Sequence, residues 1–146
     1  MSNPQTAPVI MQAAKVSDVY TAALAYQKGN LSILPLKGKR PSVEAWIGFQ
    51  SRVASEIEVH QWHKRRLLEN VGIVCGKVSG NLVVLDFDGA GAFGAFAALY
   101  PSIAQTYTVR TGSGHGKHVY LFVDKLPATT RALDTPIGNI ELRAEG

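Results

Sequence analysis

A chain of 146 residues has room for one compact domain and not for two. Its hydrophobic fraction of 46% excludes the disordered and fibrous classes, and its single cysteine, Cys75, excludes an internal disulfide or a cysteine-only zinc site. A formal net charge of +4 fits a nucleic-acid or nucleotide partner, but it is also common in proteins that bind neither.

The chain is expected to begin with a flexible leader over residues 1–16, and the folded domain is expected over residues 17–146. Ser17 and Asp18 are N-cap residues for a first helix, and Gly29 provides its C-terminal cap. This pattern predicts a helix near the start of the domain.

The next segment combines a short strand with a second helix. Residues 31–36 form an apolar strand candidate, and a basic loop follows over residues 37–41. Ser55 and Glu58 have the spacing of a capping box, which predicts a helix that runs toward Asn70.

The second half of the chain has the pattern of strands. Strands are expected over residues 71–76, 82–88, 106–111, 118–123 and 139–143. One helix interrupts them over residues 90–99 and stops before Pro101. Helices that precede and interrupt a sheet predict an α+β domain, with a mixed β-sheet and flanking helices.

The N-terminus has no basic residue ahead of an apolar stretch, so it does not resemble a secretory signal. The longest uncharged interval, residues 89–109, is interrupted by glycine, proline and polar residues, and its apolar part is too short to span a bilayer. We therefore expect a cytoplasmic protein without a membrane partner.

Two aspartates stand at the end of an apolar strand candidate, Leu82 to Asp88. Side chains alternate along a strand, so Asp86 and Asp88 are expected on one face, where they can converge on one or two hard cations. Two like charges beside a hydrophobic run favour a bound cation. Simple turn chemistry at the end of a strand is the alternative that the residues leave open.

A glycine-rich loop joins the next two strands, over residues 112–116. Its glycines let backbone N–H groups approach phosphate oxygens, and it has side-chain donors nearby in Arg110, Ser113, Lys117 and His118. The spacing of the glycines excludes a P-loop, and the loop joins two strands instead of opening a helix. A flexible connection without a ligand is the other interpretation.

The last expected strand alternates strictly from Ile140 to Arg143, which turns Glu141 and Arg143 away from the core. If this strand lies beside the one that carries Asp86, Glu141 becomes a third acidic ligand. Otherwise Glu141 and Arg143 form an exposed pair on an edge strand.

Taken in order, these segments resemble a known family. They are similar to the N-terminal bifunctional primase-polymerase domain of the archaeo-eukaryotic primase superfamily, which is found largely in replication proteins of plasmids, phages and integrated elements. The segments are GIVCGKVSGNLVVLDFDG, TVRTGSGHGKHVYLF and IELRAEG, with PLKGKRP upstream. The likeness runs from about Ala22 to the last residue. It implies a primase-like fold whose catalytic core is related to the RNA-recognition motif. Family members continue with a further strand, so we expect the domain to be incomplete at its C-terminal end.

The resemblance also implies roles for individual residues. The metal-binding acidic pair of the family falls on Asp86 and Asp88, and its third carboxylate falls on Glu141. The loop histidine, which contacts the phosphates of the incoming nucleotide in the family, is His118. Further nucleotide-binding side chains are expected at Arg110, Ser113, Lys117 and Lys39.

The implied activity is template-directed nucleotidyl transfer, as DNA primase and DNA polymerase. Its partners would be nucleoside triphosphates and single-stranded or primed DNA, with a helicase region in the missing C-terminal part. Two Mg²⁺ or Mn²⁺ ions, held by the three carboxylates, would activate a 3′-hydroxyl and neutralise charge on the triphosphate. The basic segments 37–40 and 64–66 are candidates for contact with the template, or are surface charge without function.

Two other functions stay compatible with the residues. A non-catalytic nucleic-acid-binding module of a replication initiator would keep the fold and bind DNA without Asp86 and Asp88. A metal-dependent phosphohydrolase or sugar-nucleotide transferase would use the acid pair without a third acid and without a template.

Overall fold

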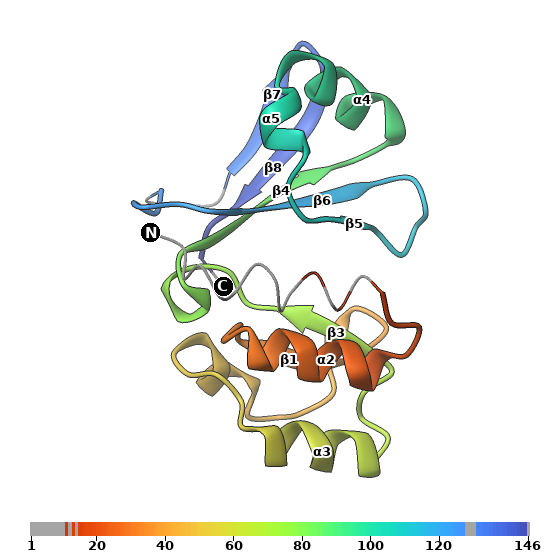
Figure 1. The fold of residues 1–146 in the computed structure, drawn as a ribbon, viewed down its shortest axis with the longest axis vertical. Helices are drawn as coiled ribbons and strands as arrows, with labels where there is room; N and C mark the ends of the chain where they lie inside the picture. The colour runs from red at the N-terminus through yellow and green to blue at the C-terminus, as the bar shows by residue number, and fades with distance from the viewer. Residues whose placement is uncertain (1–10, 12, 14, 128–130, 146) are drawn as a thin grey trace.

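The computed structural model describes residues 11, 13, 15–127 and 131–145. Most of the expected leader lies outside the described residues, although the side chain of Ala13 is described and is buried in the core. Figure 1 shows two halves stacked along the long axis of the molecule, with the first part of the chain below and the larger sheet above.

The lower half is built from short helices and a small sheet. Its elements are α2 (Val19–Lys28), β1 (Ile33–Lys37), β2 (Arg40–Pro41), η1 (Trp46–Gln50), α3 (Glu56–Lys64), β3 (Asn70–Ile73) and η2 (Lys77–Ser79). The upper half carries the larger sheet with two helices. Its elements are β4 (Leu82–Phe87), α4 (Ala90–Leu99), α5 (Pro101–Ala104), β5 (Thr108–Arg110), β6 (Lys117–Phe122), β7 (Arg131–Thr135) and β8 (Gly138–Arg143).

The expected caps of the first two helices are confirmed. The Asp18 carboxylate accepts a hydrogen bond from the Thr21 N–H at the start of α2, and Ser55 and Glu58 form the capping box of α3. The second helix ends at Lys64, earlier than expected. Arg66 adopts a positive φ of 56°, and its N–H bonds back to the carbonyl of His63, which closes the helix.

The α+β class is confirmed, but the strands form two sheets instead of one. The strand orders are β2-β1-β3 and β5-β6-β4-β8-β7, and every pair in them is antiparallel rather than mixed. The runs expected over residues 71–76 and 82–88 belong to different sheets, because the chain turns at Gly76, where φ is 96°. The edge strand β7 was not expected, since its sequence has no apolar alternation.

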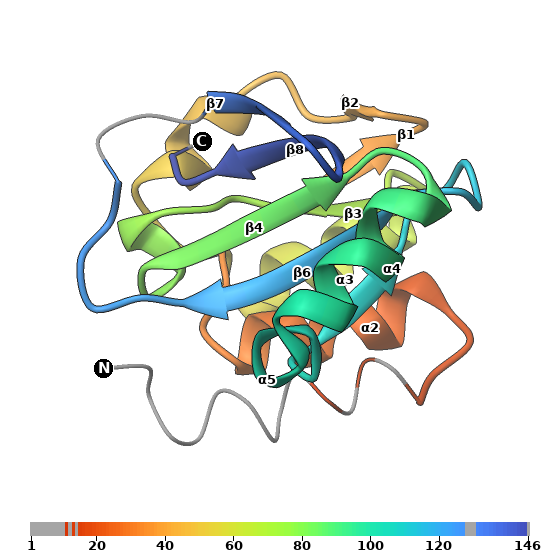
Figure 2. The ribbon, with the colours of Figure 1, turned by 90° about the horizontal axis from the view of Figure 1, so that it is seen from above.

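Other elements pack against both faces of the larger sheet, and on the upper face α4 and α5 lie over one side of it (Figure 2). On one face, Phe87, Val119 and Ile140 pack against α4, which spans the range expected from the sequence. On the other face, Leu82, Val84 and Tyr120 belong to the core that is shared with the lower half. The strand residues that alternate with Leu85 and Phe87 therefore point into the interface between the two halves.

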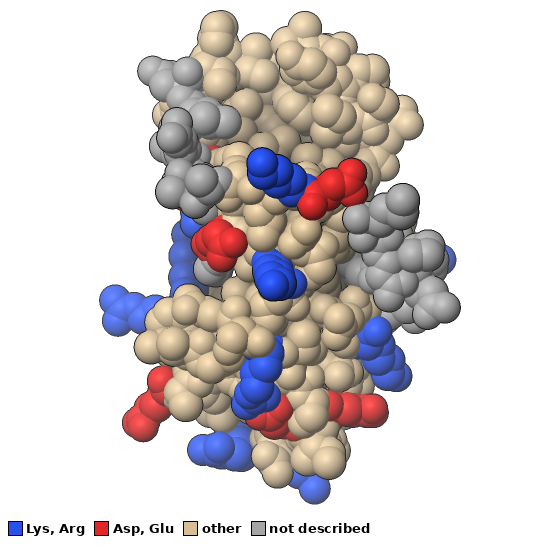
Figure 3. All heavy atoms as spheres, turned by 90° about the vertical axis from the view of Figure 1, so that its left-hand side faces the viewer, with Lys and Arg blue, Asp and Glu red and all other residues tan. Residues whose placement is uncertain are grey.

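Charged side chains of both signs are mixed over the middle and lower parts of the surface in Figure 3, and the upper part is largely uncharged. The uncharged part fits the sequence of α4 and α5, which has no charged residue. The net positive charge is thus not gathered into a basic patch on this face. Within the part of the chain that is described, no helix has the length and apolar character needed to cross a membrane.

Candidate functional site

Three of the expected site residues form one row across the larger sheet. In the β4–β6 pair Asp86 lies opposite His118, and in the β4–β8 pair the same Asp86 lies opposite Glu141. Residues directly opposite each other on antiparallel strands have Cβ atoms about 4.5–5.5 Å apart and project from the same face. The row therefore joins residues that are far apart in the sequence. The strand that carries Glu141 lies beside the strand that carries Asp86, which is the condition under which Glu141 was expected to be a third acidic ligand.

The row lies at the rim of the interface between the two halves. Val84 and Tyr120, the next residues on the same face of β4 and β6, are buried. Asp86 and His118 keep 15% and 34% of their side-chain surface exposed, with Nε2 of His118 3.3 Å from Oδ1 of Asp86. The sheet thus changes along its strands from a buried apolar contact to an accessible polar row.

A guanidinium group lies between the two carboxylates. The Nη2 atom of Arg143 is 3.0 Å from Oε2 of Glu141 and 3.3 Å from Oδ2 of Asp86, and Nε of Arg143 is also 3.3 Å from that Asp86 oxygen. Arg143 occupies this position because it follows Glu141 by two residues on β8 and so projects from the same face. The acidic pair therefore shares one positive charge.

Asp88 lies outside the paired register of β4. The strand β4 ends at Phe87, and Gly89, with φ of 89°, turns the chain into α4, so the alternation that would align Asp88 with Asp86 stops one residue short. The Asp88 side chain is exposed. Among the described residues, no group of three or more His, Cys, Asp or Glu side chains is placed to hold a metal ion. The strand register brings Asp86 together with Glu141, and Asp88 follows directly after the end of β4.

The glycine-rich loop between β5 and β6 is closed by its own hydrogen bonds. The Gly114 N–H donates to the carbonyl of Thr111, and the Thr111 N–H donates to the carbonyl of Gly116. The hydroxyl of Thr111 accepts from the Gly116 N–H and lies 2.9 Å from the hydroxyl of Ser113. These N–H groups are directed into the loop, which leaves fewer of them for an anion than the glycine pattern suggested.

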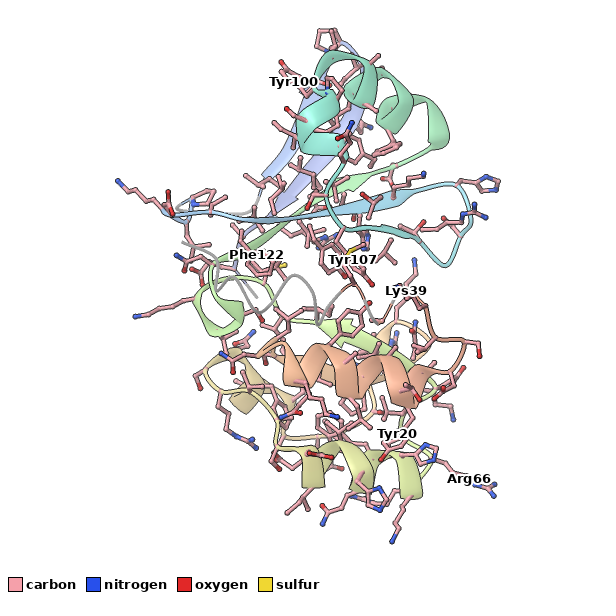
Figure 4. The ribbon with its side chains drawn as sticks, viewed as in Figure 1. Tyr20, Lys39, Arg66, Tyr100, Tyr107 and Phe122 are labelled. Atoms are coloured by element: carbon pink, nitrogen blue, oxygen red, sulfur yellow. The ribbon has the colours of Figure 1, made fainter. Side chains whose placement is uncertain are left out.

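The expected nucleotide-binding side chains lie on the β5–β6 hairpin, except for Lys39, which comes from the lower half. Lys117 and His118 are consecutive on β6 and point to opposite faces, and Nζ of Lys117 lies 4.5 Å from the ring centroid of Phe93 on α4. Arg110 is opposite Lys117 in the register of β5 and β6. Lys39 lies in the exposed turn between β1 and β2, on the same side of the molecule as the glycine loop, whereas Arg66 points away from the site (Figure 4).

A pocket of about 390 Å³ adjoins the row on the His118 side. It is lined by the start of α2, by β3, by residues 109–112, and by Tyr26, His118 and Tyr120. The Tyr26 hydroxyl lies 2.8 Å from that of Tyr107, which Figure 4 shows between the two halves. Burial raises the pKa of both Tyr26 and Tyr120, so these phenols stay neutral.

Sequence reasoning missed two parts of this arrangement. Arg143 was placed on the same face as Glu141, but its contact with Asp86 depends on the pairing of β8 with β4. Tyr26 and Asn70 line the pocket from segments that carry no recognisable motif. No pattern in the sequence indicates that these segments meet.

A comparison with models of protein families identifies the family of this chain. Residues 23–146 match the model of a family described as "Bifunctional DNA primase/polymerase, N-terminal". No curated protein matches the chain. The matched range contains every residue of the row and of the glycine loop, and it begins inside α2.

Proposed function

Because the chain belongs to the family of bifunctional DNA primase/polymerase N-terminal domains, we propose that it transfers nucleotides to a growing strand on a DNA template, with divalent metal ions held at Asp86 and Glu141. The family assigns a DNA primase/polymerase function in general. The observation that carries the finer proposal is the row of Asp86, Glu141 and His118 at an accessible rim of the sheet.

The carboxylates of Asp86 and Glu141 are chemically suited to bind a divalent cation. They face each other across a strand pair, and they already share one positive group, the Arg143 guanidinium. Carboxylate oxygens are the ligands that Mg²⁺ and Mn²⁺ prefer. Asp88 is the third ligand in this proposal, from the exposed turn after β4. A bound ion would neutralise charge on the triphosphate and activate the attacking hydroxyl.

His118 and the pocket are assigned to the nucleotide. The imidazole lies beside Asp86 and also lines the pocket, so it can donate a hydrogen bond to a phosphate oxygen next to the acidic pair. Arg110 also lines the pocket, and the exposed Ser113 and Lys39 supply further donors in the proposal. The family resemblance alone extends the proposal to the replication of a plasmid, phage or integrated element, together with a helicase.

Incorporation of labelled nucleotides on primed and unprimed single-stranded DNA, with Mg²⁺ or Mn²⁺, tests this function. We expect Asp86→Asn and Glu141→Gln each to lower incorporation by at least about a hundredfold, since a metal ion contributes several kcal/mol to such a reaction. Glu56→Gln, an exposed acid on α3, is the matched control and should keep full activity. Unchanged incorporation in both site variants would contradict the proposal.

A second function has an observation in its favour. Arg143 contacts both carboxylates, and among the described residues no group of three or more His, Cys, Asp or Glu side chains is placed to hold a metal ion, as expected of a non-catalytic DNA-binding module. Such a module would bind single-stranded DNA equally well as wild type and as Asp86→Asn, and it would incorporate no nucleotide with either metal. DNA binding by fluorescence anisotropy, measured beside incorporation, separates the two functions.

A further inference from the structure

The contact that the proposed function leaves unexplained is the position of Arg143. Its guanidinium bonds to Oδ2 of Asp86 through Nε and Nη2, and to Oε2 of Glu141 through the same Nη2. Nε2 of His118 lies 3.3 Å from Oδ1, the other oxygen of the Asp86 carboxylate. Both oxygens of Asp86 thus face a nitrogen group, and Arg143 is the residue that contacts both carboxylates.

The ion pairs of Arg143 offset a repulsion between Asp86 and Glu141 that the strand register creates. Asp86 and Glu141 lie directly opposite each other, and two like charges at this spacing repel. Asp86 is mostly shielded from water, with 15% of its side chain exposed, so the repulsion is screened less than on an open surface. One guanidinium placed against both carboxylates offsets this repulsion.

The same position is the one that a divalent cation needs. Asp86 and Glu141 are two of the proposed metal ligands, and each of them uses an oxygen atom to accept from Arg143. A metal ion and the guanidinium are both positive, so they cannot share these oxygens without repulsion. The Arg143 side chain is 47% exposed and has room to move toward solvent.

We propose that Arg143 is an internal counter-ion, which holds the acidic pair together in the metal-free protein and must leave Asp86 and Glu141 when a divalent cation binds. The inference rests on the proposed metal site. It makes Arg143 a regulator of metal affinity: the guanidinium stabilises the empty site and thereby lowers the affinity for the ion.

Binding of Mn²⁺ to the 146-residue chain, without nucleotide or DNA, tests the inference. The free ion is followed by electron paramagnetic resonance, and thermal unfolding is followed with and without Mn²⁺. We expect Arg143→Gln to bind Mn²⁺ about tenfold more tightly than wild type, because a competing charged hydrogen bond is removed. The same variant should have a lower Tm without metal and a larger rise in Tm when Mn²⁺ is added.

Two further variants complete the design. Arg52→Gln removes an exposed guanidinium that binds Glu58 through two hydrogen bonds, at 2.9 and 2.7 Å, and it should leave Mn²⁺ affinity unchanged. Arg143→Lys keeps the positive charge and should bind Mn²⁺ less tightly than Arg143→Gln. Circular dichroism checks that each variant is folded.

The outcomes distinguish the inference from the function on which it rests. If wild type binds Mn²⁺ in a manner that Asp86→Asn abolishes, and Arg143→Gln binds no more tightly, the counter-ion role is wrong and the metal site stands. If Asp86→Asn binds Mn²⁺ as well as wild type, or if neither wild type nor Arg143→Gln binds it, the metal site is wrong and the inference falls with it. Tight binding by Arg143→Gln alone supports the inference most directly.

Discussion

Asp86 and His118 lie directly opposite each other across the β4–β6 pair, with Nε2 of His118 3.3 Å from Oδ1 of Asp86. On its other side Asp86 faces Glu141, and His118 lines the pocket that adjoins the row. The imidazole therefore lies between the acidic pair and the pocket. This position suits a group that contacts the phosphates of a nucleotide whose reacting end is near the carboxylates.

The first prediction concerns His118. We expect His118→Ala to raise the KM for nucleotide by about tenfold and to change kcat less, because a charge-assisted hydrogen bond to the bound phosphates is lost. His115→Ala, at an exposed position of the same loop, is the control and should change neither constant. Steady-state kinetics of incorporation measure both. A large fall in kcat at constant KM would place the imidazole in the chemical step instead.

The second prediction concerns the glycine loop. A Cβ atom at Gly116 would lie 2.7 Å from the carbonyl oxygen of Phe87 and 2.8 Å from the hydroxyl oxygen of Thr111. We expect Gly116→Ala to push the loop away from the end of β4, at a cost of about 1–3 kcal/mol in the free energy of unfolding. Incorporation should fall as well, because β4 carries Asp86.

Gly112→Ala is the matched control for this loop. A Cβ atom there meets nothing within 4 Å, so its effect on unfolding should stay within about 0.5 kcal/mol. Urea denaturation of both variants measures the difference. Equal stability of the two would show that the close approach of Gly116 to β4 is not needed.

The third prediction concerns the pH dependence of stability through Glu58. Hydrogen bonds from Arg52, helped by the capping box, lower the pKa of Glu58 to about 2 from its ordinary 4.5. A lowered folded-state pKa gives stability that is present above about pH 4.5 and is lost as the pH falls toward 2. Glu58→Gln should therefore cost about 1 kcal/mol at pH 7, and less at pH 3.

Denaturation at several pH values checks this dependence, with Glu56→Gln on the same helical turn as the control. The control should show a smaller loss of stability at pH 7 than Glu58→Gln. A loss in Glu58→Gln that is the same at pH 3 and pH 7 would contradict the role of the ionised carboxylate.

The fourth prediction concerns Cys75. Burial raises the pKa of this thiol to about 11, and only 5% of the residue is exposed. We expect iodoacetamide at pH 8 to label the native protein far more slowly than the urea-unfolded protein, because the thiolate is the reactive form. Mass spectrometry follows the adduct, which can form at one cysteine only. Rapid labelling of the native protein would mean that this segment opens.

Elements with local signals were predictable from the sequence. The capping box of α3, the Asp18 cap of α2 and the bounds of α4 depend on residues within one or two turns of each other. The hairpin of β5 and β6 was predictable for the same reason. The edge strand β7 was not, because an edge strand that pairs on one side needs no apolar alternation.

The candidate site was predictable only in part. Alternation along a strand places Glu141 and Arg143 on one face, and it also sends Lys117 and His118 to opposite faces, so the position of Lys117 against Phe93 follows a rule that the sequence already contained. Asp88 was expected on the same strand as Asp86, whereas β4 ends at Phe87, and the convergence of the two carboxylates stays a prediction.

The sequence by itself determined α2, α3, α4 and most of the strands, the polar face of β8, and the family to which those ordered motifs are similar, because these depend on neighbours along the chain. Only the tertiary structure decided that Asp86 stands between His118 and Glu141, that Arg143 lies between the two carboxylates, and that the row opens beside a pocket. The physical reason is strand order: which strands pair is settled by packing of the whole sheet against α4 and the lower half, and residue spacing does not encode it.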